Sequence, residues 1–163
     1  MATIGIKFFE LTLNGPEENA GLIFDYPEEA SQTFLKKQPV VFDASSGEIE
    51  VATDTGIAAG MSLEAASGTA GTMILVQLFT YDQFWSGNVS TAGAARVSAV
   101  TDIGRSFDWL ASSVTGQTAK TVFDDAGTAQ FDCYALDPRD VVGDTSGRLL
   151  VRVAAGKIGP NTS

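Results

Sequence analysis

Short apolar segments alternate with polar residues and turns through the first half of the chain. Residues 48–51 (Glu-Ile-Glu-Val) and 61–64 (Met-Ser-Leu-Glu) place apolar side chains at every second position, which is typical of a strand with one face in a core. Residues 40–42 and 73–79 are mostly apolar, and turns rich in Gly, Ser and Asp separate the four segments. Short strands at this spacing predict a first small antiparallel β-barrel or sandwich module over residues 33–80.

The second half of the chain repeats this organisation. Its candidate strands are residues 96–100, 120–123, 130–136 and 148–153. A Gly-Asp-Thr-Ser-Gly turn precedes the last of them, as Gly-Thr-Ala-Gly precedes the last strand of the first half. We therefore expect a second β-rich module over residues 81–155 and a flexible polar tail over residues 156–163. The fold class expected for the chain is mainly β.

Residues 1–32 form a leader that differs from both modules. Apolar and polar residues nearly alternate over residues 4–14, and a second apolar patch begins at Leu22. We expect an extended N-terminal arm that packs on its own sheet, a sister subunit or a partner, with an edge hairpin of the main fold as the alternative. Residues 27–32 have the pattern of one helical turn that starts with Pro. The candidate protein-interface residues of the arm are Phe8, Phe9, Leu11, Leu13, Ile23, Phe24 and Tyr26.

Charge and hydropathy narrow the function classes. The 163 residues carry a formal net charge of −10, and residues 1–64 hold 11 acidic residues against three Lys. An acidic surface repels phosphate backbones, so we expect no direct binding to nucleic acid. No run of apolar residues exceeds four, whereas a membrane-spanning helix needs about 20. We therefore expect a soluble protein that does not insert into a membrane and is not conventionally secreted.

Few residue types for catalysis or metal binding are present. The chain has no His and a single Cys, Cys133, which excludes Ser-His-Asp and Cys-His catalysis, His-based metal sites and a disulfide within the chain. The alternation of residues 131–136 places Cys133 in the core of a strand. Acidic residues are frequent from Asp124 to Asp144 without the order of a calcium loop, and residues 137–140 are expected to form a turn in which acid and base pair. We expect no catalytic residues, no cofactor and no metal.

One short motif points instead to an enzyme. Asp54-Thr55-Gly56, followed later by Ile103-Gly104-Arg105, is similar to the signature of retroviral-type aspartic proteases, in which two subunits each supply one Asp. The apolar strand that should precede the Asp is missing, and Asp-Thr-Gly is also an ordinary turn sequence. A dimeric aspartic protease therefore stays as an alternative.

The pattern of turns and strands resembles a known family. Residues 33–41 (Thr-Phe-Leu-Lys-Lys-Gln-Pro-Val-Val) and 56–65 (Gly-Ile-Ala-Ala-Gly-Met-Ser-Leu-Glu-Ala) resemble segments of head decoration proteins, or capsid cement proteins, of tailed bacteriophages. Residues 137–148, before Leu-Leu-Val, resemble phage virion structural proteins. The resemblance implies a non-enzymatic β protein, often a homotrimer, made in the host bacterial cytoplasm. Such a protein binds the outer capsid surface and stabilises contacts between major capsid protein subunits. A tail- or fibre-associated adaptor stays as a further alternative.

Overall fold

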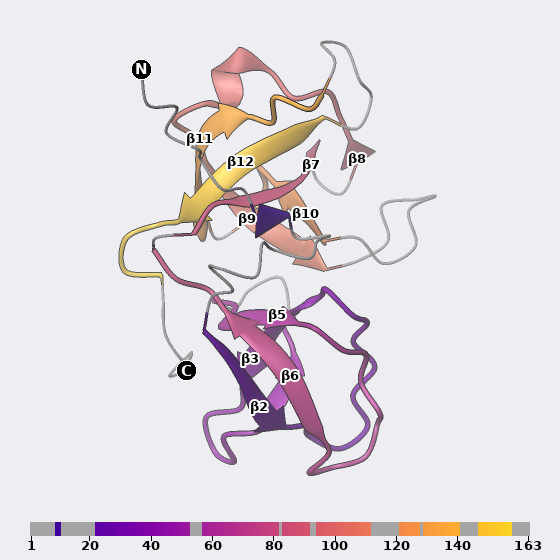
Figure 1. Ribbon diagram of the computed structural model, residues 1–163. Coiled ribbons are helices and arrows are strands. Elements are labelled where there is room, and N and C mark those ends of the chain that lie inside the picture. The colour runs from indigo at the N-terminus through magenta and orange to yellow at the C-terminus, as the bar shows by residue number, and fades with distance from the viewer. Residues whose placement is uncertain are drawn as a thin grey trace, which may run out of the picture.

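Strands in two sheets make up nearly all of the regular structure (Figure 1). The computed structural model describes residues 9–10, 22–52, 57–81, 83–91, 94–111, 121–127, 129–140 and 147–157. Within these residues the one helical element is a single 3-10 turn, η2 (Val100–Asp102). The prediction of a mainly β fold is confirmed.

The first sheet, named the five-stranded sheet, lies in the lower half of Figure 1. Its strands are β2 (Ile23–Pro27), β3 (Pro39–Phe42), β4 (Ile49–Val51), β5 (Gly60–Ser62) and β6 (Met73–Leu78). They pair antiparallel in the order β2-β6-β5-β3-β4. A parallel bridge between Glu28 and Ile49 connects the end of β2 with β4, so the sheet curves until its two outer strands meet at one end.

Glu28 fixes the turn that precedes β6. Its carboxylate is fully buried and accepts hydrogen bonds from the Ser67 N–H (2.8 Å), the Ser67 hydroxyl (2.9 Å) and the Gly68 N–H (2.6 Å). Residues 29–32 form no helical turn, and Ser31 has a φ of 64°. The predicted helical turn at residues 27–32 is therefore wrong, because a single turn has little stability of its own against these tertiary hydrogen bonds.

The second sheet, named the seven-stranded sheet, closes on itself in the upper half of Figure 1. Its strands are β1 (Phe9–Glu10), β7 (Trp85–Thr91), β8 (Ala94–Ala95), β9 (Ser106–Ala111), β10 (Thr121–Asp124), β11 (Phe131–Leu136) and β12 (Arg148–Val153). β7, β10, β9, β11 and β12 pair in that order, and β12 pairs again with β7 to form a ring. β7 runs parallel to β1 and β10, whereas the other pairs are antiparallel.

Aromatic side chains fill this ring. Trp85, Phe107, Trp109, Phe123 and Phe131 are each at most 1% exposed. The Phe131 ring lies edge-on to Phe79 with centroids 5.4 Å apart, and it is tilted by 60° to Phe123 with centroids 5.3 Å apart. Rings at such distances and tilts bury a large area in favourable contact, so the alternating inward residues of the strands supply a dense core.

The two sheets share one core. Met61 of β5, with Ala52 and Ala58 from the segments beside β4 and β5, belongs to the same buried cluster as the aromatic residues of the seven-stranded sheet. The Gln130 side chain joins the sheets as well, because its Nε2 donates to the Ala58 carbonyl (2.7 Å) and its Oε1 accepts from the Ala58 N–H (3.0 Å). The two predicted modules therefore pack as one body.

The residues predicted as an arm contribute to both sheets. β2 is an outer strand of the five-stranded sheet, paired with β6. β1 pairs with β7 of the seven-stranded sheet. Residues 1–8 and 11–21 lie outside the described residues, as do residues 158–163 of the predicted tail.

Candidate interaction surfaces

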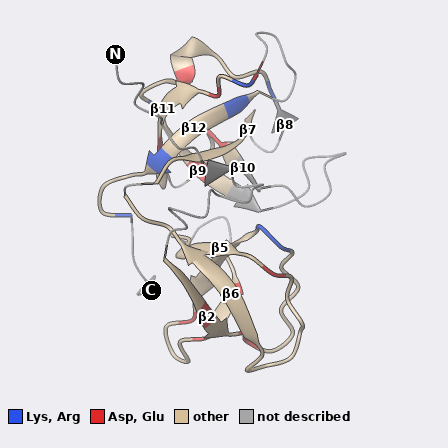
Figure 2. Ribbon diagram, in the orientation of Figure 1, with Lys and Arg blue, Asp and Glu red and all other residues tan. Residues whose placement is uncertain are grey.

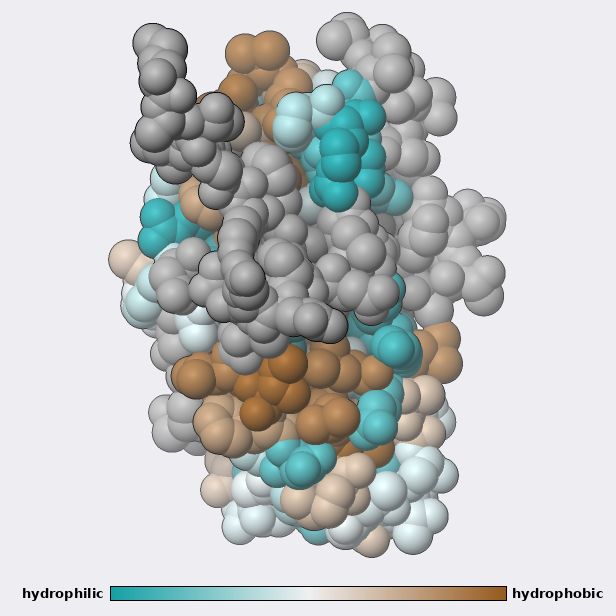
Figure 3. All heavy atoms as spheres, in the orientation of Figure 1, coloured by the Kyte–Doolittle hydropathy of each residue, from teal (hydrophilic) through white to brown (hydrophobic). Residues whose placement is uncertain are grey.

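Strand β2 and its neighbour β6 carry an exposed apolar surface, named the β2 surface. Leu22, Phe24 and Met73 are 55%, 47% and 53% exposed, and Ile23 is 37% exposed. Figure 3 shows hydrophobic side chains gathered over this part of the five-stranded sheet. The pairing of β2 with β6 places Leu22 and Phe24 on one face of the sheet and Ile23 and Met73 on the other, so apolar side chains flank the outer strand on both faces. Single exposed apolar residues are normal on a protein, whereas several beside one strand edge mark a candidate contact with another molecule.

Alternation along β2 explains why part of this group is exposed. Tyr26 faces the core of the five-stranded sheet, and its ring lies 4.6 Å from the ring of Phe42. Burial raises the pKa of the Tyr26 hydroxyl. Phe24 lies on the same face, with its ring 6.3 Å from that of Tyr26. The row of side chains therefore continues the core outward until it reaches solvent at Phe24.

The backbone of β2 adds a second feature to this surface. The Leu78 N–H donates to the Leu22 carbonyl and the Glu28 N–H donates to the Thr72 carbonyl, both at 2.8 Å. Hydrogen-bonded pairs recur at every second residue of an antiparallel ladder, so the peptide groups of Ile23 and Asp25 point away from β6. Within the described part of the chain no strand pairs with this outer edge. An open edge with apolar neighbours can accept a strand from another chain.

The predicted interface residues are placed only in part. Ile23, Phe24 and Tyr26 lie together on β2. Phe9 lies in β1, opposite Trp85 of β7. The remaining three predicted residues, Phe8, Leu11 and Leu13, fall outside the described residues. Sequence reasoning missed Met73, because a residue on a distant segment joins the surface only through strand pairing.

A second apolar group lies at η2, the coil at the top of Figure 1, far from β2. Val100 is 75% exposed, and Val97 and Ile103 are 41% and 45% exposed. These three residues, with the loop that carries them, are named the η2 tip. Exposed apolar residues on a loop that is held rigid lose little entropy when a partner covers them.

Ion pairs hold the η2 tip. The buried Asp102 carboxylate accepts hydrogen bonds from two guanidinium nitrogens of Arg96 (2.9 and 2.8 Å) and from the Ala99 N–H (2.8 Å). Burial opposes the charged form, but the Arg96 and Ala99 hydrogen bonds outweigh it and lower the pKa of Asp102. The predicted strand at residues 96–100 is wrong because these contacts turn the chain into η2.

The other acidic residues of the seven-stranded sheet have structural partners. Asp137 accepts hydrogen bonds from the Ser86 hydroxyl (2.6 Å) and from Arg139 Nε (2.8 Å), and Asp140 pairs with Arg148 at 2.6 Å. The expected acid–base turn at residues 137–140 is confirmed. Most of the basic residues that the structure describes lie on this sheet and its loops (Figure 2). Over the described residues no group of three or more His, Cys, Asp or Glu is arranged to hold a metal ion.

The protease motif is described only in part. Asp54-Thr55-Gly56 falls outside the described residues. Ile103-Gly104-Arg105 forms the turn between η2 and β9, where the Gly104 N–H donates to the Cys133 carbonyl at 2.9 Å. Gly104 has a φ of 84°, which glycine adopts without strain. A tight turn accounts for Gly at this position, and the enzymatic alternative stays a prediction.

Cys133 is a core thiol, as the alternation predicts. It is 2% exposed and belongs to the shared core. Burial raises the pKa of the Cys133 thiol to about 11, and the negative charge of Asp102 adds to the shift. Because the thiolate is the reactive form, only on the order of 0.1% of the thiol is reactive near pH 8.

Cys133 is therefore expected to resist thiol reagents while the protein is folded. With Ellman's reagent at pH 8, the native protein should react at least about a hundredfold more slowly than the protein in guanidinium chloride. Release of one equivalent of thionitrobenzoate at equal rates in both conditions would contradict the buried position.

No helix among the described residues is long and apolar enough to cross a membrane. Comparison of the chain with protein-family models, with curated proteins and with solved structures finds no match.

Proposed function

We propose that this protein is a non-enzymatic structural component of a phage virion, and specifically a head decoration protein that binds the outer surface of the capsid. The observation that carries the proposal is the β2 surface, where half-exposed Leu22 and Phe24 lie on one face beside a strand edge that no described strand covers. Aromatic residues are enriched in protein interfaces and at their energetic centres. Strand addition at the edge of β2 supplies backbone hydrogen bonds that fix the register of a partner.

The two apolar surfaces suit a protein that clamps neighbouring capsid subunits. The β2 surface lies on the five-stranded sheet and the η2 tip on the far side of the seven-stranded sheet (Figure 1). A shared core joins the two sheets, so both contacts sit on one stiff body. One copy can therefore bridge two major capsid protein subunits or, as a homotrimer, one capsid subunit and a sister copy. Stable contacts of this kind bury on the order of 1,600 Å² in total.

The net charge of the protein supports binding at the outer face of the capsid. A net charge of −10 is repelled by packaged DNA, which lies on the inner face. A tail or fibre adaptor would share the two apolar surfaces, and it differs from a decoration protein only in where it binds. Particle location is therefore the deciding measurement.

Binding to undecorated expanded heads is the direct test. Purified protein is mixed with heads of the phage that encodes it, and co-sedimentation gives the affinity. Phe24→Asp is expected to reduce the affinity roughly tenfold or more, because it puts a charge into the centre of the buried contact. Leu35→Asp is the matched control, since Leu35 is 44% exposed and belongs to neither β2 nor β6, and it should bind as the wild type does.

Two results would overturn the proposal. One is wild-type protein that stays in the supernatant with heads but sediments with tails or fibres. The other is Phe24→Asp protein that is folded and binds heads with wild-type affinity, which would remove the β2 surface from the contact.

A further inference from the structure

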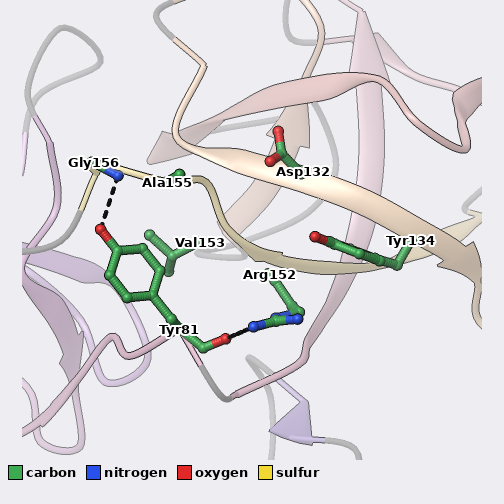
Figure 4. A pocket seen from close by; sticks show the side chains of 7 residues that line it. All are labelled: Tyr81, Asp132, Tyr134, Arg152, Val153, Ala155 and Gly156. Atoms are coloured by element: carbon green, nitrogen blue, oxygen red, sulfur yellow. Dashed lines mark hydrogen bonds between the residues drawn. The ribbon is translucent and has the colours of Figure 1, made fainter.

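An open pocket lies on the outer face of the seven-stranded sheet, between β11, β12 and the segment that leads into β7. Its volume is about 370 Å³, and its lining includes Tyr81, Asp132, Tyr134 and Arg152. Figure 4 shows the Tyr81 and Tyr134 side chains on opposite sides of the hollow, with Arg152 between them. Tyr81 and Tyr134 are 42% and 51% exposed, so two large rings reach solvent at one place.

Alternation along β11 points Tyr134 to the outer face, and a β-bulge lies at this position. The pairing of β11 with β12 shifts between Cys133 and Ala135, which leaves Tyr134 as the extra residue. Bulges re-aim a side chain and occur often beside binding sites. Asp132 lies directly opposite Arg152 in the ladder, so an acidic and a basic side chain flank the rings.

The pocket is held in shape without a ligand. Arg152 Nε donates to the Tyr81 carbonyl at 2.7 Å, and a second guanidinium N–H donates to the same oxygen. The guanidinium carbon lies 5.4 Å from the ring centroids of both Phe84 and Tyr134. The Tyr81 hydroxyl accepts a hydrogen bond from the Gly156 N–H at 2.9 Å. Little ordering is left to be lost when a ligand binds.

We propose that this pocket binds a neutral saccharide. The C–H face of a sugar ring packs on aromatic rings such as those of Tyr81 and Tyr134, which bring a large apolar area and a polar hydroxyl together. The sugar hydroxyls are both donors and acceptors. They can therefore donate to the Asp132 carboxylate, which among the described residues accepts a hydrogen bond from the Ser106 hydroxyl, and accept from the tyrosine hydroxyls.

Other ligand classes fit the pocket less well. The opposite charges of Asp132 and Arg152 offset each other, so the pocket offers neither a cation nor an anion a charge of one sign to pair with. A wholly apolar ligand would take both charged groups out of water without replacing their hydrogen bonds. A ligand that is uncharged, rich in hydroxyls and partly apolar meets each of these conditions.

The proposal does not depend on the proposed function, since the pocket and the β2 surface use different residues on different sheets. A protein that binds heads and no sugar, or a sugar and no heads, separates the two.

Titration with oligosaccharides tests the pocket. The probes are neutral hexasaccharides of glucose, xylose and mannose, and oligomers of polygalacturonate and chitosan serve as charged comparisons. Binding to the full chain is measured by two-dimensional NMR. We expect at least one neutral probe to shift amide signals of residues 132–134 and 152–156 with a millimolar or tighter Kd, and the charged probes to leave them unchanged.

Variants then assign the binding to the rings. Tyr134→Ala should weaken saccharide binding at least about tenfold. Tyr134→Phe keeps the ring, and Phe24→Ala changes the β2 surface instead of the pocket, so both variants should retain most of the saccharide affinity. The proposal is overturned if no neutral probe shifts these amides, if only a charged probe does, or if folded Tyr134→Ala protein binds as the wild type does. If Tyr134→Ala does not fold, the amide shifts of the wild-type protein decide alone. Shifts with a neutral probe support the proposal, and no shifts or shifts with only a charged probe overturn it.

Discussion

Replacing Gly60 with alanine is expected to lower the free energy of unfolding by about 3 kcal/mol, the upper part of the range for overpacking. Gly60 is buried in β5, between β3 and β6. A Cβ at this position would lie 2.5 Å from the carbonyl oxygen of Gln77 and 2.8 Å from a methyl carbon of Val76. The carbonyl belongs to the backbone of β6, so it cannot move aside without breaking the ladder between the two strands.

Thermal and urea unfolding measure this effect, and Gly47→Ala is the matched control. Gly47 has a φ of 74° and nothing within 4 Å of its added Cβ, so its replacement costs only backbone strain of about 1 kcal/mol. For a domain of this size we expect the Tm of Gly60→Ala to fall by roughly 10 °C and that of Gly47→Ala by roughly 3 °C. Equal losses in the two variants would show that the β5–β6 contact is looser than the distances indicate.

The local pattern of the sequence predicts most of the strands but not how they pair. Alternation marks β4 and β5, and the apolar runs mark β3 and β6. The return of β12 to β7, which closes the ring, joins segments about 60 residues apart. Such a pairing depends on the register of every strand between them, and a local pattern does not contain that register.

The failed predictions have the same physical origin. Residues 96–100 have the composition of a strand, but Arg96 and Ala99 bond to Asp102 and turn the chain. Residues 27–32 have the composition of a helical turn, but Glu28 bonds across to Ser67. In both places a buried carboxylate gains several hydrogen bonds, which outweighs a local propensity of a few tenths of a kcal/mol per residue.

The candidate surfaces were partly visible in the sequence. Ile23 and Phe24 stand out as an apolar patch among acidic residues, and the structure adds that they lie on the outer strand of a sheet. The bulge at Tyr134 was not visible, since strict alternation over residues 131–136 gives no sign of an extra residue. Alternation alone exposes Tyr134 beside the inward Cys133, whereas the approach of Arg152 to Tyr134 emerges only from the pairing of β11 with β12.

The contact that joins the two sheets leads to the second large effect. Gln130 is 1% exposed and bonds to both the N–H and the carbonyl of Ala58. Gln130→Leu keeps a similar volume but leaves these two buried peptide groups without partners. Each unpaired group costs about 1–3 kcal/mol, so we expect the free energy of unfolding to fall by about 3 kcal/mol.

The same substitution at Gln83 provides the control. Gln83 is 4% exposed, and its Oε1 is buried without a hydrogen-bond partner among the described residues, so Gln83→Leu should change stability by less than about 1 kcal/mol. Urea unfolding is followed by the fluorescence of Trp85 and Trp109, which lie in the seven-stranded sheet, and by circular dichroism, which reports both sheets. The two transitions should coincide in the wild type, because the buried cluster spans the sheets. If Gln130→Leu is as stable as the wild type, the apolar cluster holds the sheets together alone and the Gln130 hydrogen bonds add nothing net.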